Sequence, residues 1–245
     1  MNARTPNYGI DAPGVIVTLG FFAVVLMPLG WFFVTHLARS QPQPWTSLGM
    51  TMFVTGAICL VEVLLMFSSS LVGKFLARDK LLDGLRLSGD ETVLDAGCGH
   101  GLLLVGAARR LPRGRAIGLD LWSQKDQARN SREATLRNAR IEGVADRVEV
   151  QDGDMQRMPF PDACFDAVVA SLSVHNISSR EGRRKAIQEI VRVLKPGGQV
   201  ALLDFRCVGQ YADDLRAAGM NALRVSWPSF RIFPPVRTVI GAKPR

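Results

Sequence analysis

A short apolar segment of this chain runs directly into a glycine-rich turn and then into a helical pattern, and this order of elements limits the folds that the chain can adopt. Residues 91–95 (ETVLD) predict a buried strand, residues 96–101 (AGCGHG) a tight turn, and residues 102–111 a helix. Glycine lets the backbone turn sharply and approach a ligand closely, and the N–H groups that begin the helix then point toward that ligand. The segment therefore predicts an α/β sheet with a nucleotide-type ligand at the carboxyl end of its first strand.

The spacing of the glycines narrows the kind of ligand. A dinucleotide site favours the pattern GxGxxG, whereas here Gly97, Gly99 and Gly101 alternate, and Leu102 stands where the third glycine should be. Asp95 lies two residues before the first of these glycines. A carboxylate at this place repels a pyrophosphate and suits a ligand that carries an ammonium and a sulfonium. A nicotinamide-dependent oxidoreductase is therefore disfavoured.

The segment VLDAGCGHG at residues 93–101 resembles the first motif of the class I S-adenosylmethionine-dependent methyltransferases. Further motifs of that family follow in its order: IGLD at 117–120, GDM at 153–155, FDAVVAS at 165–171 and LKPGG at 194–198. The resemblance is strongest from residue 91 to residue 205. It implies S-adenosylmethionine as cofactor and a Rossmann-like seven-stranded mixed sheet with helices on both faces, closed by an antiparallel hairpin at residues 221–226 and 236–242.

The resemblance and the positions of the motifs also indicate which residues bind the cofactor. Asp120 ends an apolar strand, where a carboxylate can accept both hydroxyls of a ribose. By resemblance Asp154 accepts from the adenine amine and Met155 offers a backbone N–H, although Asp154 could instead only form the turn beside Gly153. Trp122 either packs on the adenine or caps the edge of the sheet. The expected cofactor-binding set is Asp95, Gly97, Cys98, Gly99, Gly101, Asp120, Leu121, Asp154, Met155 and Ser171.

His175 is the histidine best placed for chemistry, because it follows the fourth predicted strand at its carboxyl end. An imidazole titrates near neutral pH and can act as a general base, which makes His175 the candidate catalytic residue. The alternative is that it bonds backbone or lines the cofactor site. Methyl transfer from a sulfonium needs mainly alignment of the reactants, so a base is required only where the acceptor must lose a proton.

The first part of the chain predicts a membrane segment. Residues 12–35 contain no charged side chain, and a second apolar stretch at about 46–70 is interrupted only by Glu62. Each is long enough for a transmembrane helix. We therefore expect a membrane segment at residues 1–73, with two spans, and a catalytic domain at residues 74–245. Glu62 could contact the first helix or a substrate head group, or sit protonated.

Basic residues near the ends of the spans indicate the orientation. Arg4 precedes the first span, and Lys74, Arg78 and Lys80 follow the second, against Arg39 alone in the connector at residues 38–47. By the positive-inside rule the catalytic domain is expected to face the cytoplasm.

Composition excludes two other classes of partner. The net charge is +8, but the basic residues form no tract, so nucleic acid is not expected. The four cysteines form no CxxC pair and no metal-ligand spacing, so no metal site is expected.

These observations lead to one main hypothesis and one alternative. The chain is expected to transfer a methyl group to a small molecule or lipid-like substrate, hydrophobic or membrane-associated, because its core resembles the methyltransferases of quinone biosynthesis. The alternative is a non-catalytic, membrane-anchored module that binds S-adenosylmethionine. The residues do not rank carbon, oxygen and nitrogen acceptors, and they leave the oligomeric state open.

Overall fold

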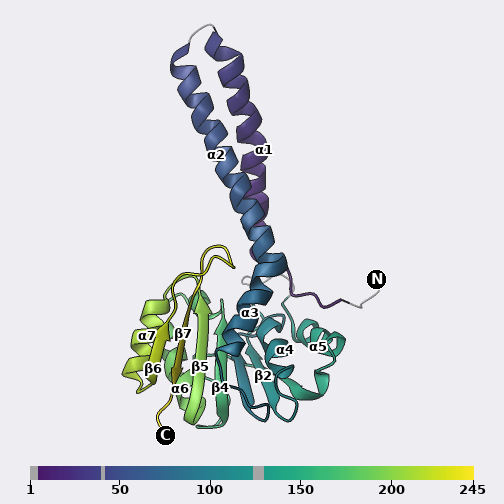
Figure 1. Cartoon of the computed structure of the whole chain (residues 1–245), viewed down its shortest axis with the longest axis vertical. Helices are drawn as coiled ribbons and strands as arrows, with labels where there is room; N and C mark the ends of the chain where they lie inside the picture. Colours follow the sequence, from purple (N-terminus) through teal and green to yellow (C-terminus); the bar gives the residue numbers. More distant parts are fainter. Residues whose placement is uncertain (1–4, 40–41, 124–129) are drawn as a thin grey trace. The chain divides into compact units, whose positions relative to one another are not determined.

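The computed structural model describes residues 5–39, 42–123 and 130–245, and the chain divides into two compact units (Figure 1). The larger unit consists of residues 1–9 and 73–245, and the smaller unit of residues 10–72. The expected membrane segment at residues 1–73 includes the first nine residues, whereas in the structure the described part of this tail packs with the larger unit.

The larger unit is built on a mixed seven-stranded sheet of order β3-β2-β1-β4-β5-β7-β6. The first five strands are parallel, and β7 runs antiparallel to both β5 and β6. This confirms the predicted Rossmann-like sheet with its closing hairpin. The strands are β1 Thr92–Ala96, β2 Arg115–Asp120, β3 Val148–Asp152, β4 Phe165–Ser171, β5 Leu194–Asp204, β6 Asn221–Val225 and β7 Arg237–Ala242.

Helices cover both faces of this sheet, as expected. One apolar cluster joins α3 and α4 to the sheet through residues such as Leu82 and Leu104, and a second joins α6 and α7 through Ile187 and Tyr211. The helices are α3 Lys74–Asp83, α4 Leu102–Ala108, α5 Arg132–Ile141, α6 Arg180–Val193 and α7 Val208–Ala217, with short 3₁₀ turns η3 Ala145–Arg147 and η4 Val174–Asn176. Helix α4 is shorter than the predicted 102–111, because Pro112 disfavours a helical conformation in the residue before it.

The smaller unit is a helical hairpin. Its elements are α1 Pro13–Thr35, η1 Leu37–Arg39, α2 Pro42–Ser68 and the π-helical turn η2 Ser69–Gly73, whose last residue belongs to the larger unit. Glycines allow α1 and α2 to approach closely: a Cβ at Gly30 would lie 2.5 Å from the carbonyl oxygen of Gly49, and one at Gly56 would lie 2.9 Å from the backbone nitrogen of Met27. Close packing through small residues is typical of helix pairs in membranes. Both helical segments are long and apolar enough to cross a bilayer.

The outer surface of the hairpin is apolar. Val17, Phe21, Val24 and Trp31 of α1 and Leu64 of α2 are all exposed. Glu62 is partly buried on α2. Arg4 and residues 40–41 of the connector lie outside the described part of the chain, so the predicted orientation stays a prediction.

The N-terminal tail lies against the first glycine turn of the larger unit. The amide side chain of Asn138 accepts from the backbone N–H of Asn7 and donates to the carbonyls of Asn7 and His100. The buried ammonium of Lys74 donates to the carbonyls of Tyr8 and Gly9. A Cβ at Gly9 would lie 3.2 Å from the imidazole of His100, so glycine is needed for this contact. The tail therefore covers His100 instead of leaving it to solvent.

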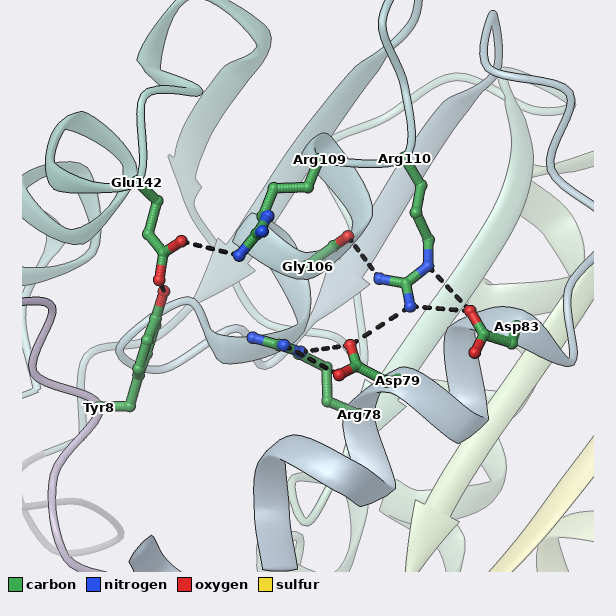
Figure 2. Close-up of polar contacts among 8 residues, drawn as sticks. All are labelled: Tyr8, Arg78, Asp79, Asp83, Gly106, Arg109, Arg110 and Glu142. Atoms are coloured by element: carbon green, nitrogen blue, oxygen red, sulfur yellow. Dashed lines mark hydrogen bonds and ion pairs between the residues drawn. The ribbon is translucent and has the colours of Figure 1, made fainter. Parts of the chain in front are cut away.

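Ion pairs join α3, α4 and α5, and a hydrogen bond from Tyr8 adds the tail to them (Figure 2). Arg110 pairs with Asp79 and Asp83, and Arg109 pairs with Glu142, which also accepts a hydrogen bond from the hydroxyl of Tyr8. Burial and the nearby Glu142 carboxylate raise the pKa of Tyr8. A further pair joins Arg78 to Asp79. Because a carboxylate faces each of these three guanidinium groups, the cluster is a structural clasp and offers no free charge to an anion.

Candidate functional site

The glycine turn between β1 and α4 has the geometry that its sequence predicts. Gly97, Gly99 and Gly101 all have positive φ, at 78°, 51° and 82°. A Cβ at Gly97 would lie 2.4 Å from Cβ of Ser173, and one at Gly101 would lie 2.8 Å from Thr135. The turn therefore requires glycine both for its backbone conformation and for its neighbours. It lies at the carboxyl end of β1, where ligands bind in open α/β sheets.

Asp95 lies at the start of this turn with its carboxyl group buried. The residue is 2% exposed, and its Oδ2 atom has no hydrogen-bond partner among the described residues. Burial, together with the charge of nearby Asp120, raises the pKa of Asp95 to about 8. A buried carboxyl oxygen without a donor fits a ligand that brings a cationic donor to it.

Asp120, at the end of β2, organises the loops around it. Its carboxylate accepts from the backbone N–H of Gly99 at 2.8 Å, from that of Trp122 at 2.7 Å and from the side-chain amide of Asn130 at 3.1 Å. The indole of Trp122 donates to Asp152 at the end of β3, so it spans the carboxyl ends of two strands. Asp120 therefore holds the glycine turn in place at the carboxyl edge of the sheet.

Asp154 and Met155 follow β3 at this edge. Asp154 accepts from the backbone N–H and the side-chain amide of Gln156, which is the turn-forming role that the sequence left as an alternative. The Cε atom of Met155 would lie 3.0 Å from a Cβ at Gly97, so its side chain borders the glycine turn. The structure thus brings the third loop next to the first.

The remaining expected cofactor-binding residues, Cys98, Leu121 and Ser171, differ in burial and in the group that faces the carboxyl edge of the sheet. Cys98 is buried, and its Sγ would lie 2.7 Å from a Cβ at Gly118, so its thiol belongs to the core and only its backbone faces the turn. Burial raises the pKa of this thiol well above its usual value. Leu121 is exposed beyond β2, and Ser171 ends β4 at the same edge.

His175 lies in η4, directly after β4, and faces the end of β5. Its Nδ1 lies 2.9 Å from Oδ1 of Asp204, an ion-pair distance at which the ring angle falls outside hydrogen-bond geometry. The carboxylate of Asp204 is buried and accepts from the hydroxyl of Tyr211 at 3.1 Å. Burial and the Asp204 charge raise the pKa of Tyr211, so its hydroxyl stays protonated. The ring of Phe205 packs edge-on against the imidazole. The position of His175 is therefore fixed by the Asp204 carboxylate, which is fixed in turn by its hydrogen bond from Tyr211.

Sequence reasoning missed several residues that shape this site. Asp204 and Tyr211 support His175, and Thr135 and Asn138 of α5 donate to the carbonyls of Gly99 and His100. The end of β5 was a visible signal for Asp204, since carboxyl ends of parallel strands meet at one edge. Nothing local in α5 indicates its contact with the glycine turn, because that contact depends on how the helix packs.

Residues 94–202 match the sequence family described as "Methyltransferase domain". The matched residues make up less than half of the chain. The chain is 27% identical to the demethylmenaquinone methyltransferase of Lactobacillus johnsonii over 169 residues, which cover 67% of this chain and 61% of that protein. The chain thus spans about three fifths of this relative.

Solved structures show the same fold. A SAM-dependent methyltransferase from Aquifex aeolicus superposes with a TM-score of 0.53 at 20% identity, covering 67% of this chain and 88% of that one. The [4+2]-cyclase SpnF gives a TM-score of 0.58 at 23% identity, covering 69% of this chain and 81% of that one. The cofactor of the domain is S-adenosylmethionine. The likeness to a cyclase means that the reaction must be argued from the site and not from the fold.

Proposed function

We propose that this protein transfers a methyl group from S-adenosylmethionine to a small hydrophobic acceptor that resides in or on a membrane. The observation that carries the proposal is the position of His175 and Asp204 at the same edge of the sheet as the glycine turn, Asp95 and Asp120. A base and a cofactor site thus share one edge.

In this proposal three carboxylates hold the cofactor. The unpartnered oxygen of Asp95 receives the cofactor's ammonium, Asp120 binds the ribose hydroxyls, and Asp154 with the Met155 backbone binds the adenine. The positive φ angles of Gly97, Gly99 and Gly101 give the tight turn that would bring the backbone close to the ligand. The bound cofactor supplies a methyl group on a sulfonium, which is already activated as a leaving group.

His175 takes the proton that an acceptor hydroxyl or ring carbon loses. Asp204 stabilises the imidazolium that forms, and Tyr211 keeps Asp204 in place. With Nδ1 turned toward Asp204, Nε2 is the nitrogen that receives the proton. Methyl transfer then forms one bond from the acceptor to carbon and breaks the carbon–sulfur bond, leaving S-adenosylhomocysteine and the methylated acceptor.

The helical hairpin supports a membrane-associated acceptor. Its large apolar side chains face outward along both helices, and water would solvate such a surface poorly. The demethylmenaquinone methyltransferase named above acts, by its name, on a quinone precursor. A prenylated ring compound is therefore the acceptor class that we test first, with the larger unit on the cytoplasmic face.

The test uses the full chain in detergent micelles or nanodiscs with S-adenosylmethionine labelled on its methyl group. Cofactor binding is measured by calorimetry, and transfer is measured as label in the organic phase of a membrane-lipid extract. Asp120→Ala should abolish both, whereas Asp213→Ala, at an exposed position of α7, should change neither. Binding without transfer to any lipid fraction would instead support a non-catalytic cofactor-binding module. A folded chain that does not bind the cofactor would refute both.

A further inference from the structure

The connection between β6 and β7 carries two aromatic side chains in open solvent. This segment, residues 226–236, is called the β6–β7 loop below, and Figure 1 shows it leaving one end of the sheet. Trp227 is 90% exposed and Phe230 is 79% exposed. Exposure of two large aromatic residues three positions apart is costly in water and marks a contact surface.

Trp227 and Phe230 are exposed although the loop that carries them is held in place by hydrogen bonds and by buried side chains. Ser229 and Val236 exchange two backbone hydrogen bonds, of 2.7 and 3.0 Å, that extend the hairpin beyond its strands. Ile232 and Val236 are buried in the core of the larger unit. The backbone carbonyl of Arg231 also lies against Gly73, where no Cβ could fit. The loop is therefore pinned along its length while its two aromatic rings point away.

The chain segment that carries these aromatic residues contains only positive charges. Residues 215–245 contain no aspartate and no glutamate. Arg224, Arg231 and Arg237 are all exposed, and within the described part of the chain none of them takes part in an ion pair. Aromatic rings beside unpaired arginines are what an interface between water and anionic lipid attracts.

The β6–β7 loop lies at the edge of the sheet where the proposed reaction takes place. In the antiparallel register of the two strands, Arg237, the first residue of β7, lies opposite Asp204, the last residue of β5. Asp204 is also the partner of His175. The β6–β7 loop, with its two aromatic residues, therefore begins at the carboxyl edge of the parallel strands, which is the edge that also holds His175.

We propose that the β6–β7 loop docks on an anionic lipid surface, with Trp227 and Phe230 entering the head-group layer and Arg224 and Arg231 facing lipid phosphates. This contact is separate from the helical hairpin and gives the larger unit its own hold on the bilayer. It rests on the proposed membrane-associated acceptor, because it would bring the carboxyl edge of the sheet to the surface from which such a molecule is taken.

The test uses ¹⁹F NMR of the full chain in nanodiscs of phosphatidylcholine and phosphatidylglycerol. The chain has four tryptophans, so 5-fluorotryptophan gives four signals, each assigned by a single Trp→Phe variant. A nitroxide on the lipid head group then broadens the signals of tryptophans that lie near it. We expect loss of the Trp227 signal, while the signal of Trp122, which follows β2 in the other half of the sheet, persists.

The signals of Trp31 and Trp45 in the hairpin separate the possible failures. If these two are broadened and Trp227 is not, the loop does not dock and this proposal alone is wrong. If neither hairpin tryptophan is broadened, the membrane-associated acceptor is refuted as well. Equal broadening of Trp122 and Trp227 would show contact by the whole surface and would also overturn the proposal.

A charge-reversal pair tests the role of the arginines. Arg231→Glu should restore the Trp227 signal, at least in part, because it places a negative charge against anionic lipid. Arg216→Glu makes the same change in the last turn of α7, at the opposite edge of the sheet, and should leave the signal broadened. Omitting phosphatidylglycerol should act like Arg231→Glu. If the Trp227 signal stays broadened both in Arg231→Glu and without phosphatidylglycerol, the loop does not recognise anionic lipid and the proposal is wrong.

Discussion

The buried carboxyl group of Asp95 predicts that cofactor binding releases a proton. With a pKa of about 8 in the cofactor-free protein, the group is about nine-tenths protonated at pH 7 and about one-tenth protonated at pH 9. An ammonium placed against the unpartnered Oδ2 favours the ionised form. Binding should therefore release about 0.9 proton at pH 7 and about 0.1 proton at pH 9, and the dissociation constant should fall roughly tenfold per pH unit between about pH 5 and 7.

The same shift fixes the sign of the pH dependence of stability. Folding raises the pKa of Asp95 from 3.8 to about 8, so the folded state favours the protonated carboxyl group. The free energy of unfolding therefore falls as the pH rises from about 4 to about 8. One proton corresponds to about 1.4 kcal/mol of unfolding free energy per pH unit. Asp95→Asn resembles the protonated carboxyl group and should remove this contribution while weakening cofactor binding.

Proton release is measured by calorimetry of S-adenosylhomocysteine binding in buffers of different ionisation enthalpy. The matched ligand is 5′-methylthioadenosine, which has the nucleoside but no ammonium and should release no proton. Asp146→Asn, at an exposed position of η3, serves as the control variant. Equal proton release with both ligands, or release that persists in Asp95→Asn, would refute the assignment of Asp95 to the ammonium.

Three further predictions concern the base, the glycine turn and the hairpin. His175→Gln should lower kcat for labelled-methyl transfer by about 10²-fold or more with an unchanged cofactor Kd, whereas a matched loss of binding would contradict its role as a base. Gly97→Ala should lower the melting temperature and the cofactor affinity, because its Cβ would lie 2.4 Å from Cβ of Ser173; unchanged melting would disprove this packing. Gly30→Leu should destabilise the hairpin in micelles, measured by thermal melting, while Gly20→Leu, with open space around it, should not.

Much of the fold could be predicted because its signals are local. The apolar strand, glycine turn and helix at residues 91–111 predict an α/β sheet, and the family motifs imply the other strands. The strands at 165–171, 221–225 and 237–242 lie where these motifs place them. The end of α4 was predicted three residues late, because helical periodicity continues through Leu111 while Pro112 already ends the helix. Such boundaries depend on one residue and not on the pattern around it.

The parts of the site that sequence could not show depend on contacts between distant segments. Asn138 meets Asn7 across 131 positions, and Asp204 meets His175 only because β4 and β5 are adjacent in the sheet. Cys98 sits in a motif whose backbone faces the turn, yet its thiol points into the core toward Gly118. A motif predicts which residues surround a ligand, but the packing decides whether the backbone or the side chain of each residue faces it.

The packing of the N-terminal tail makes the hairpin an insertion within the larger unit. The Lys74 ammonium bonds to the carbonyls of Tyr8 and Gly9, so the chain leaves this unit and re-enters it at nearly the same point. During synthesis the apolar hairpin is complete before the first strand of the sheet is made, and in the proposed membrane-associated protein its insertion into the bilayer would precede folding of the rest. For protein engineering, joining Gly9 to Gly73 through a few glycines would excise the hairpin and keep the tail over the glycine turn, which a truncation at residue 73 would remove.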